Sequence, residues 1–145
     1  LNEDERNFGK GETSPIGKIT AENSGLTGKV VFFDSSDYDG LDSELDYLFG
    51  GRSFTVFKAD EQGLTEIYTS GNEFEAKTAG YELEHFNCSN DNNDIDDRSG
   101  KKGVEAENVT IGNVGEKIYA FIGLERIGGV MMYDVTNPEK ISYAN

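Results

Sequence analysis

The most informative hydrophobic pattern of the chain lies in residues 119–138, YAFIGLERIGGVMMYDVTNP. An apolar and aromatic run at 119–123 is followed by a charged, glycine-rich segment at 124–129 and by a second apolar run at 130–135. The turn-forming residues Asn137 and Pro138 end the second run. Two such runs around a glycine-rich segment predict an antiparallel hairpin, with residues 124–129 exposed at its turn.

An earlier segment repeats this layout. Residues 47–60 read YLFGGRSFTVFKAD, and four positions match the later hairpin: Tyr47, Phe49, Gly51 and Arg52 correspond to Tyr119, Phe121, Gly123 and Arg126. Repeats of strand and turn are typical of β-propellers, in which each blade is a small antiparallel sheet. The repeat predicts about two propeller blades.

Short apolar runs elsewhere predict further strands at residues 16–20, 29–33, 64–69, 104–114 and 141–143. Residues 73–77 are compatible with the start of a short helix, and the polar segment 87–103 is predicted to be a surface loop. The predicted fold is therefore all-β with antiparallel sheets, a β-propeller-like domain at 15–145 and a flexible lead-in at 1–14. Because a blade cannot bury both of its faces alone, we expect either a fragment of a larger propeller or contacts with other blades or chains through exposed sheet edges.

Charge narrows the classes of partner. The 145 residues carry a formal net charge of -15, with 28 acidic and 13 basic side chains. Such a chain is repelled by nucleic-acid phosphates and by anionic membrane surfaces, so metal cations or basic partners are the expected ligands. The alternative is that the acidity serves solubility alone. No apolar run of membrane-spanning length is present, so we expect no membrane insertion.

The segment 34–46, DSSDYDGLDSELD, is a candidate calcium loop. Calcium takes six to eight oxygen ligands, and closely spaced carboxylates around a glycine turn can converge on one ion. The candidate ligands are the acidic residues Asp37, Asp39, Asp42, Glu44 and Asp46. The alternative is a solvated acidic loop, which is also the preferred interpretation of the second acidic segment, residues 90–98.

Nucleophilic catalysis finds little support in the sequence. His85 is the only histidine and Cys88 the only cysteine, so no triad with a spare base can be assembled. No catalytic residue is assigned on this basis.

Three segments carry a resemblance to a known family: LFGGRSFTVF at 48–57, SGNEFE at 70–75, and residues 97–138 with the hairpin described above. Together they resemble the choice-of-anchor I domain, a family of secreted and surface-anchored bacterial β-propeller proteins. The family includes mesenchyme-specific cell-surface glycoproteins and alkaline-phosphatase-like proteins. The resemblance implies a secreted or cell-surface location and a binding or structural role, with calcium as the expected ion.

The resemblance also implies a second candidate site. Calcium-dependent propeller phytases and phosphatases have a similar glutamate-rich strand and an acidic hairpin at the mouth of the central channel. By that similarity Glu105, Glu107, Glu125 and Arg126 would lie at such a mouth. The alternative is structural, with Arg52 and Arg126 tying turns together through carboxylates and carbonyls. Whether the protein is an enzyme stays open: the alternative function is part of a calcium-dependent phosphoester hydrolase.

Overall fold

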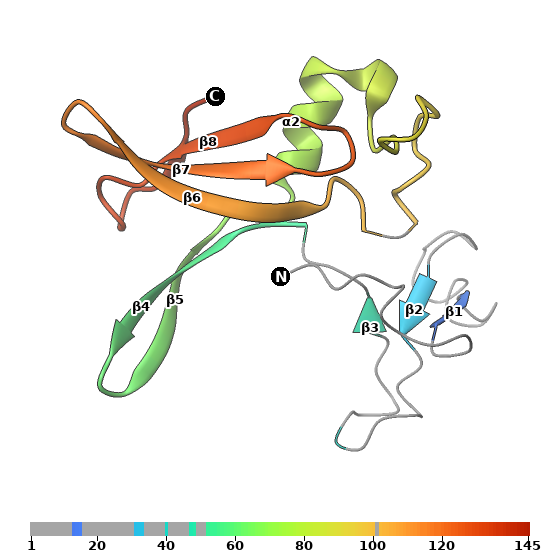
Figure 1. Ribbon diagram of the computed structural model, residues 1–145. Helices are drawn as coiled ribbons and strands as arrows, with labels where there is room; N and C mark the ends of the chain where they lie inside the picture. Colours follow the sequence, from blue (N-terminus) through green and yellow to red (C-terminus); the bar gives the residue numbers. More distant parts are fainter. Residues whose placement is uncertain (1–12, 16–30, 34–39, 41–46, 49–51, 101) are drawn as a thin grey trace.

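The computed structural model describes residues 13–15, 31–33, 40, 47–48, 52–100 and 102–145. Within these residues the fold is mostly antiparallel β-sheet with one short α-helix, as predicted, and no described sheet closes into a barrel (Figure 1). In chain order the elements are β1 (Thr13–Pro15), β2 (Val31–Phe33), β3 (Tyr47–Leu48), β4 (Thr55–Asp60), β5 (Gly63–Thr69), α2 (Glu73–Tyr81), the 3₁₀ turn η3 (Leu83–His85), β6 (Ala106–Val114), β7 (Lys117–Leu124), β8 (Val130–Asp134) and β9 (Ser142–Tyr143). The sheets are β1-β2-β3, β4-β5 and β6-β7-β8-β9.

The predicted C-terminal hairpin is confirmed. Strands β7 and β8 pair antiparallel from Tyr119 opposite Asp134 to Gly123 opposite Val130. With β6 on one side and β9 on the other, the hairpin completes a four-stranded meander, which is the strand order of a propeller blade.

The predicted exposure of residues 124–129 is correct for Glu125, Gly128 and Gly129, but Leu124 is buried and Arg126 and Ile127 are only partly exposed. Leu124 is only 5% exposed, because β7 extends through it and Leu124 takes the same inward face as Ala120 and Ile122. Side chains alternate between the two faces of a strand, so a run that continues by one residue buries one more side chain.

The internal repeat does not place its two copies in equivalent hairpins. Tyr47 belongs to β3 and pairs with Phe33 of β2, whereas Tyr119 belongs to β7 and pairs with β6 and β8. The hairpin near the first copy is instead β4–β5, which turns between Asp60 and Gly63. Gly63 has φ +124, a backbone conformation that side chains rarely adopt, so glycine suits this turn.

Helix α2 covers the inner face of the four-stranded sheet (Figure 1). Phe74 of the helix is fully buried with Ile122, Met131 and Tyr133 of the sheet. The Tyr133 ring lies 4.7 Å from the Phe54 ring and 5.9 Å from the Phe74 ring, in the edge-on arrangement that aromatic pairs favour. The core is therefore an aromatic cluster between one helix and one sheet.

The hydroxyl group of the buried Tyr133 has a hydrogen-bond partner in the first turn of α2. Tyr133 Oη donates a hydrogen bond of 2.8 Å to Oε2 of Glu73. Burial and this bond raise the pKa of Tyr133, and burial together with the negative charge of Glu73 raises the pKa of Tyr68 to about 12. Both phenols thus stay neutral throughout the physiological range.

Removing an aromatic ring from helix α2 should cost more unfolding free energy at a buried position than at an exposed one. Replacing Phe74 by Ala removes a fully buried ring, so the free energy of unfolding should fall by about 3–5 kcal/mol. The matched control is Tyr81→Ala, whose ring is 76% exposed and whose loss should cost less than about 1 kcal/mol. Urea unfolding followed by circular dichroism measures both, and equal losses would contradict this description of the core.

Candidate functional site

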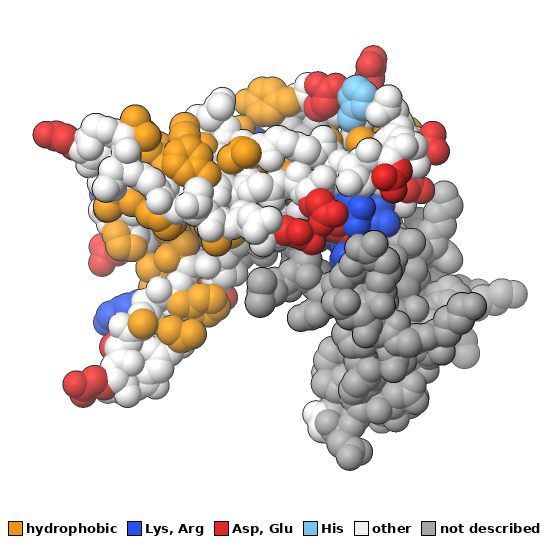
Figure 2. Space-filling model, viewed as in Figure 1, with side chains coloured by type: hydrophobic (Ala, Val, Ile, Leu, Met, Phe, Trp, Pro, Cys, Tyr) orange, Lys and Arg blue, Asp and Glu red, His pale blue; other side chains and the backbone are white. Residues whose placement is uncertain are grey.

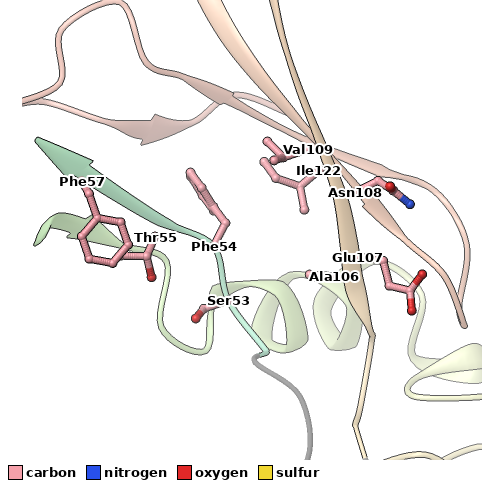
Figure 3. A pocket seen from close by; sticks show the side chains of 9 residues that line it. All are labelled: Ser53, Phe54, Thr55, Phe57, Ala106, Glu107, Asn108, Val109 and Ile122. Carbon is pink, nitrogen blue, oxygen red and sulfur yellow. The ribbon is translucent and has the colours of Figure 1, made fainter. Parts of the chain in front are cut away.

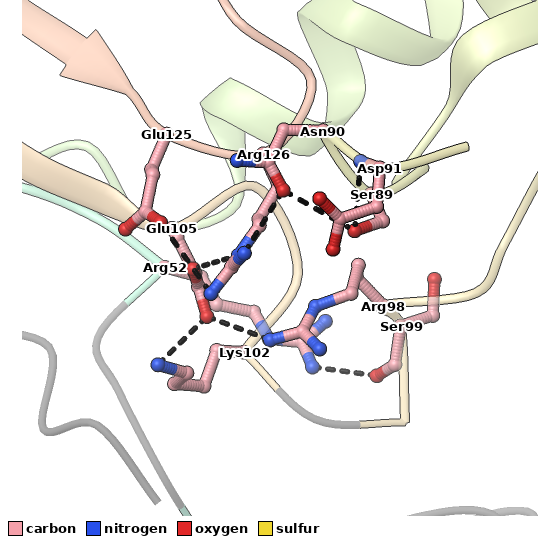
Figure 4. Close-up of polar contacts among 10 residues, drawn as sticks. All are labelled: Arg52, Ser89, Asn90, Asp91, Arg98, Ser99, Lys102, Glu105, Glu125 and Arg126. Carbon is pink, nitrogen blue, oxygen red and sulfur yellow. Dashed lines mark hydrogen bonds and ion pairs between the residues drawn. The ribbon is translucent and has the colours of Figure 1, made fainter. Parts of the chain in front are cut away.

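A buried glutamate immediately before β6 is the centre of the largest described group of ion pairs (Figure 4). Oε1 of Glu105 lies 2.9 Å from Nη2 of Arg98 and 2.8 Å from Nζ of Lys102, and Oε2 accepts a hydrogen bond from Nε of Arg126. Neither the side chain of Glu105 nor that of Lys102 has appreciable exposed surface. One buried carboxylate therefore holds three cations.

The backbone around Glu105 brings these groups together. Glu105 has φ +49, in the left-handed region, and its carbonyl accepts the amide of Glu125 at 2.9 Å. The amide of Gly103 donates to the carbonyl of Arg98 at 2.9 Å, which closes the turn that carries Arg98 and Lys102. The bond between Glu125 and Glu105 holds the segment before β6 against the turn after β7.

A second ion pair lies against the same turn. Nη1 of Arg52 is 2.7 Å from Oε1 of Glu75, and Nδ2 of Asn87 donates to the same oxygen at 2.9 Å. Gly103 adopts φ +61, and a Cβ there would lie 2.5 Å from Oε1 of Glu75. The backbone conformation favours glycine here, and a side chain at this position would also require the ends of the Glu75 and Arg52 side chains to shift.

The sequence predicted that the polar segment 87–103 is a surface loop. The structure shows that part of this segment is buried. Asn87 is 1% exposed, Cys88 4%, Ser89 8% and Lys102 1%. The prediction failed because most of the buried polar groups find partners that composition does not reveal, although within the described residues Oδ1 of Asn87 and Nε of Arg98 have no hydrogen-bond partner. The acidic residues Asp91, Asp94, Asp96 and Asp97 of this segment are exposed, as expected for a solvated stretch.

Two opposing effects act on the pKa of Glu105. Burial raises it, since a carboxylate loses its hydration, but hydrogen bonds from Lys102, Arg126 and Arg98 favour the ionised form. The net result is a pKa below the ordinary value, so Glu105 is charged at neutral pH.

Glu107 and Glu125 form a second acidic group beside Glu105. Carboxylate oxygens of Glu105, Glu107 and Glu125 all lie within 4.8 Å of one another, and both Glu107 and Glu125 are exposed. A hydrogen bond with Glu125, helped by partial burial and by the charges of Glu125 and Glu105, raises the pKa of Glu107. Like charges this close disfavour ionisation, and a cation between them would relieve the repulsion.

The structure thus brings together the second set of candidate residues, Glu105, Glu107, Glu125 and Arg126. The calcium-loop candidates Asp37, Asp39, Asp42, Glu44 and Asp46 lie outside the described residues. Sequence reasoning missed Arg98 and Lys102 as partners of Glu105, and Glu75 as the partner of Arg52. The one available signal was the glycine-rich sequence RSGKKGVE at 98–105, which places three cationic residues close to Glu105 along the chain.

Comparison with known proteins identifies relatives. The family model for the Choice-of-anchor I domain matches residues 9–138. Gigasin-3a of Magallana gigas is 33% identical over 100 residues, which are 66% of this chain and 34% of that protein. The chain therefore spans about a third of the length of this relative. No solved structure matches.

Removal of the Glu105 charge should destabilise the protein in a pH-dependent way. Glu105→Gln removes the carboxylate charge that three partly buried cations share, so the free energy of unfolding at neutral pH should fall by roughly 3 kcal/mol. Because the folded-state pKa is lowered, the contribution of Glu105 is present above the unfolded value of 4.5 and is lost as the pH falls through the folded value. The difference between wild type and variant should accordingly shrink below about pH 4.5.

Urea unfolding at a series of pH values measures this difference. The matched control is Glu116→Gln, an exposed glutamate in the turn between β6 and β7, which should leave stability unchanged at every pH. A Glu105→Gln variant as stable as wild type at pH 7 would contradict a structural role for this carboxylate.

Proposed function

Because the chain belongs to the choice-of-anchor I domain family, we propose that it is a binding module of a secreted or cell-surface protein and that it binds a divalent cation, calcium foremost, at Glu107 and Glu125. The family suggests a surface or secreted protein, and in the described part of the chain no helix is long and apolar enough to cross a membrane. The matched residues are 34% of that relative, so the activity of a whole protein that contains the domain is part of this proposal as well.

The observation that carries the cation proposal is the crowding of the three glutamates within 4.8 Å. Glu105 already pairs with Arg98, Lys102 and Arg126, so it is not counted as a ligand of the cation. Glu107 and Glu125 present exposed carboxylate oxygens, the ligands that calcium prefers. Two glutamates with water completing the coordination shell favour a weak site, of the order of 10⁻⁴–10⁻³ M, as in extracellular modules.

The hydrolase alternative has less support from the same geometry. A phosphoester site needs cations aimed at the phosphate oxygens as well as carboxylates that hold metal. Arg98, Lys102 and Arg126 supply cations near the glutamates, but each directs a nitrogen to Glu105. We therefore favour binding over phosphoester hydrolysis as the function of this domain.

Calcium titration tests the proposal. Millimolar calcium should shift the backbone amide NMR signals near Glu107 and Glu125, and the double variant Glu107→Gln/Glu125→Gln should lose these shifts because two charges are removed from the site. Binding should weaken as the pH falls towards the raised pKa of Glu107, since protonation removes a ligand. The matched control Glu61→Gln/Glu66→Gln removes two exposed charges from the β4–β5 hairpin and should bind calcium like wild type.

The variant Asp37→Asn/Asp39→Asn distinguishes the other candidate locus. Loss of calcium binding in this variant alone would move the site to the acidic segment 34–46 and would refute the assignment to Glu107 and Glu125. An unresponsive wild-type protein would refute calcium binding altogether.

A further inference from the structure

The chain contains two acceptor sequences for N-linked glycosylation, the attachment of a glycan to the side-chain amide of an asparagine. The acceptor sequence is asparagine, any residue except proline, and then serine or threonine. It occurs at residues 87–89, NCS, and at residues 108–110, NVT. The two sequences are equivalent as patterns, but their asparagines occupy very different places in the fold.

Asn87 lies inside the protein, and its amide nitrogen is already engaged. The residue is only 1% exposed. Its Nδ2 donates one hydrogen bond to Oε1 of Glu75 at 2.9 Å and another to Oγ of Ser99 at 2.8 Å. A glycan on Nδ2 would replace one of these two hydrogens and would need space that a buried side chain lacks. The folded chain therefore excludes glycosylation at Asn87.

Asn108 lies near the start of β6, and its side chain is on the face of the sheet opposite the core. It pairs with Gly123 of β7, whereas the residue that follows it pairs with the buried Ile122. Successive side chains of a strand alternate between the two faces, so Asn108 is directed away from the core. In Figure 3 the Asn108 amide accordingly points away from the ring of Phe54.

The space beside the Asn108 side chain is open. Gly123, directly opposite, has no side chain, and a Cβ there would lie 3.9 Å from Cβ of Asn108, on the same face. Asn108 is exposed, and so is Thr110, the last residue of the acceptor sequence. Because Asn108 and Thr110 are two residues apart on one strand, both lie on this outer face.

The surface next to this position is partly apolar. Figure 2 shows hydrophobic side chains on the surface of the four-stranded sheet. One of the exposed apolar residues is Val130, which pairs with Gly123 and is 59% exposed. Exposed apolar groups favour association with other chains, and a hydrated glycan at Asn108 would cover them.

We propose that Asn108 carries an N-linked glycan and that Asn87 does not. The inference rests on the secreted or cell-surface location proposed above, because N-glycans are attached as a chain enters a secretory pathway. The donor is a lipid-linked pyrophosphoryl oligosaccharide. Nδ2 of Asn108 forms a bond to the anomeric carbon of the first sugar as the bond from that carbon to the pyrophosphate oxygen breaks. The lipid pyrophosphate leaves, and the amide loses one proton.

Secretion of the full chain from cultured mammalian cells behind a cleavable signal peptide tests the proposal. The signal peptide delivers the chain to the glycosyl transferase whatever its native location, so failure here and failure of the proposed function are separate results. Peptide N-glycosidase in heavy-oxygen water converts each glycosylated asparagine into labelled aspartate, which peptide mass spectrometry detects. In the secreted chain, most Asn108 should carry the label and Asn87 should remain unlabelled. Chain retained in the cells is digested in the same way, so that Asn108 is read in either case.

Variants assign the glycan to one acceptor sequence. Asn108→Gln and Thr110→Val should each abolish the label and the gel shift of one glycan, whereas Thr110→Ser preserves the acceptor sequence and should retain both. The matched control is Asn113→Gln, which changes the same residue type at another exposed position of β6 and should leave the glycan in place.

Two results would overturn the proposal. The first is an unlabelled Asn108 in both the secreted and the retained chain. The second is a labelled Asn87 in a secreted chain whose urea unfolding matches that of the Asn87→Gln variant, because such a chain would tolerate a glycan where the fold leaves no space for one.

Discussion

The carboxylate of Glu105 is the constraint on which the described site depends. A charge without exposed surface is tolerated only when it is paired and hydrogen-bonded, and Arg98, Lys102 and Arg126 supply that pairing from two separate segments. The same residue accepts the amide of Glu125 through its carbonyl. The polar segment before β6 and the turn after β7 are therefore held together by one residue, and Glu107 and Glu125 lie side by side as a consequence.

Helix α2 connects this ion-pair group to the aromatic core. Its first turn carries Glu73, which accepts from Tyr133 in the core, and Glu75, which accepts from Arg52 and Asn87 at the polar segment. Negative charge in the first turn also suits the positive end of the helix dipole. The helix thus fixes the sheet on one side and the polar segment on the other.

The sequence predicted the strands and the helix better than the side-chain ion pairs that connect them. Apolar runs on either side of a glycine-rich turn sufficed for the β7–β8 hairpin, and a short helix at residues 73–77 was correctly considered. Resemblance grouped Glu105 with Glu107, Glu125 and Arg126, but nothing in the sequence indicated that Glu105 is buried. That burial depends on a left-handed backbone at Glu105 and on Gly103, whose contact with Glu75 joins residues distant along the chain. Periodicity records local preference, whereas ion pairing is a property of the assembled fold.

The most direct test of this account is the carboxyl ¹³C NMR titration of the glutamates in the intact chain. The account predicts that Glu105 titrates below the ordinary pKa of 4.5, because three cations stabilise its ionised form, and that Glu107 titrates above 4.5, because Glu125 opposes its ionisation. A Glu105 that titrates at or above 4.5 would contradict the claim that its charge organises the site.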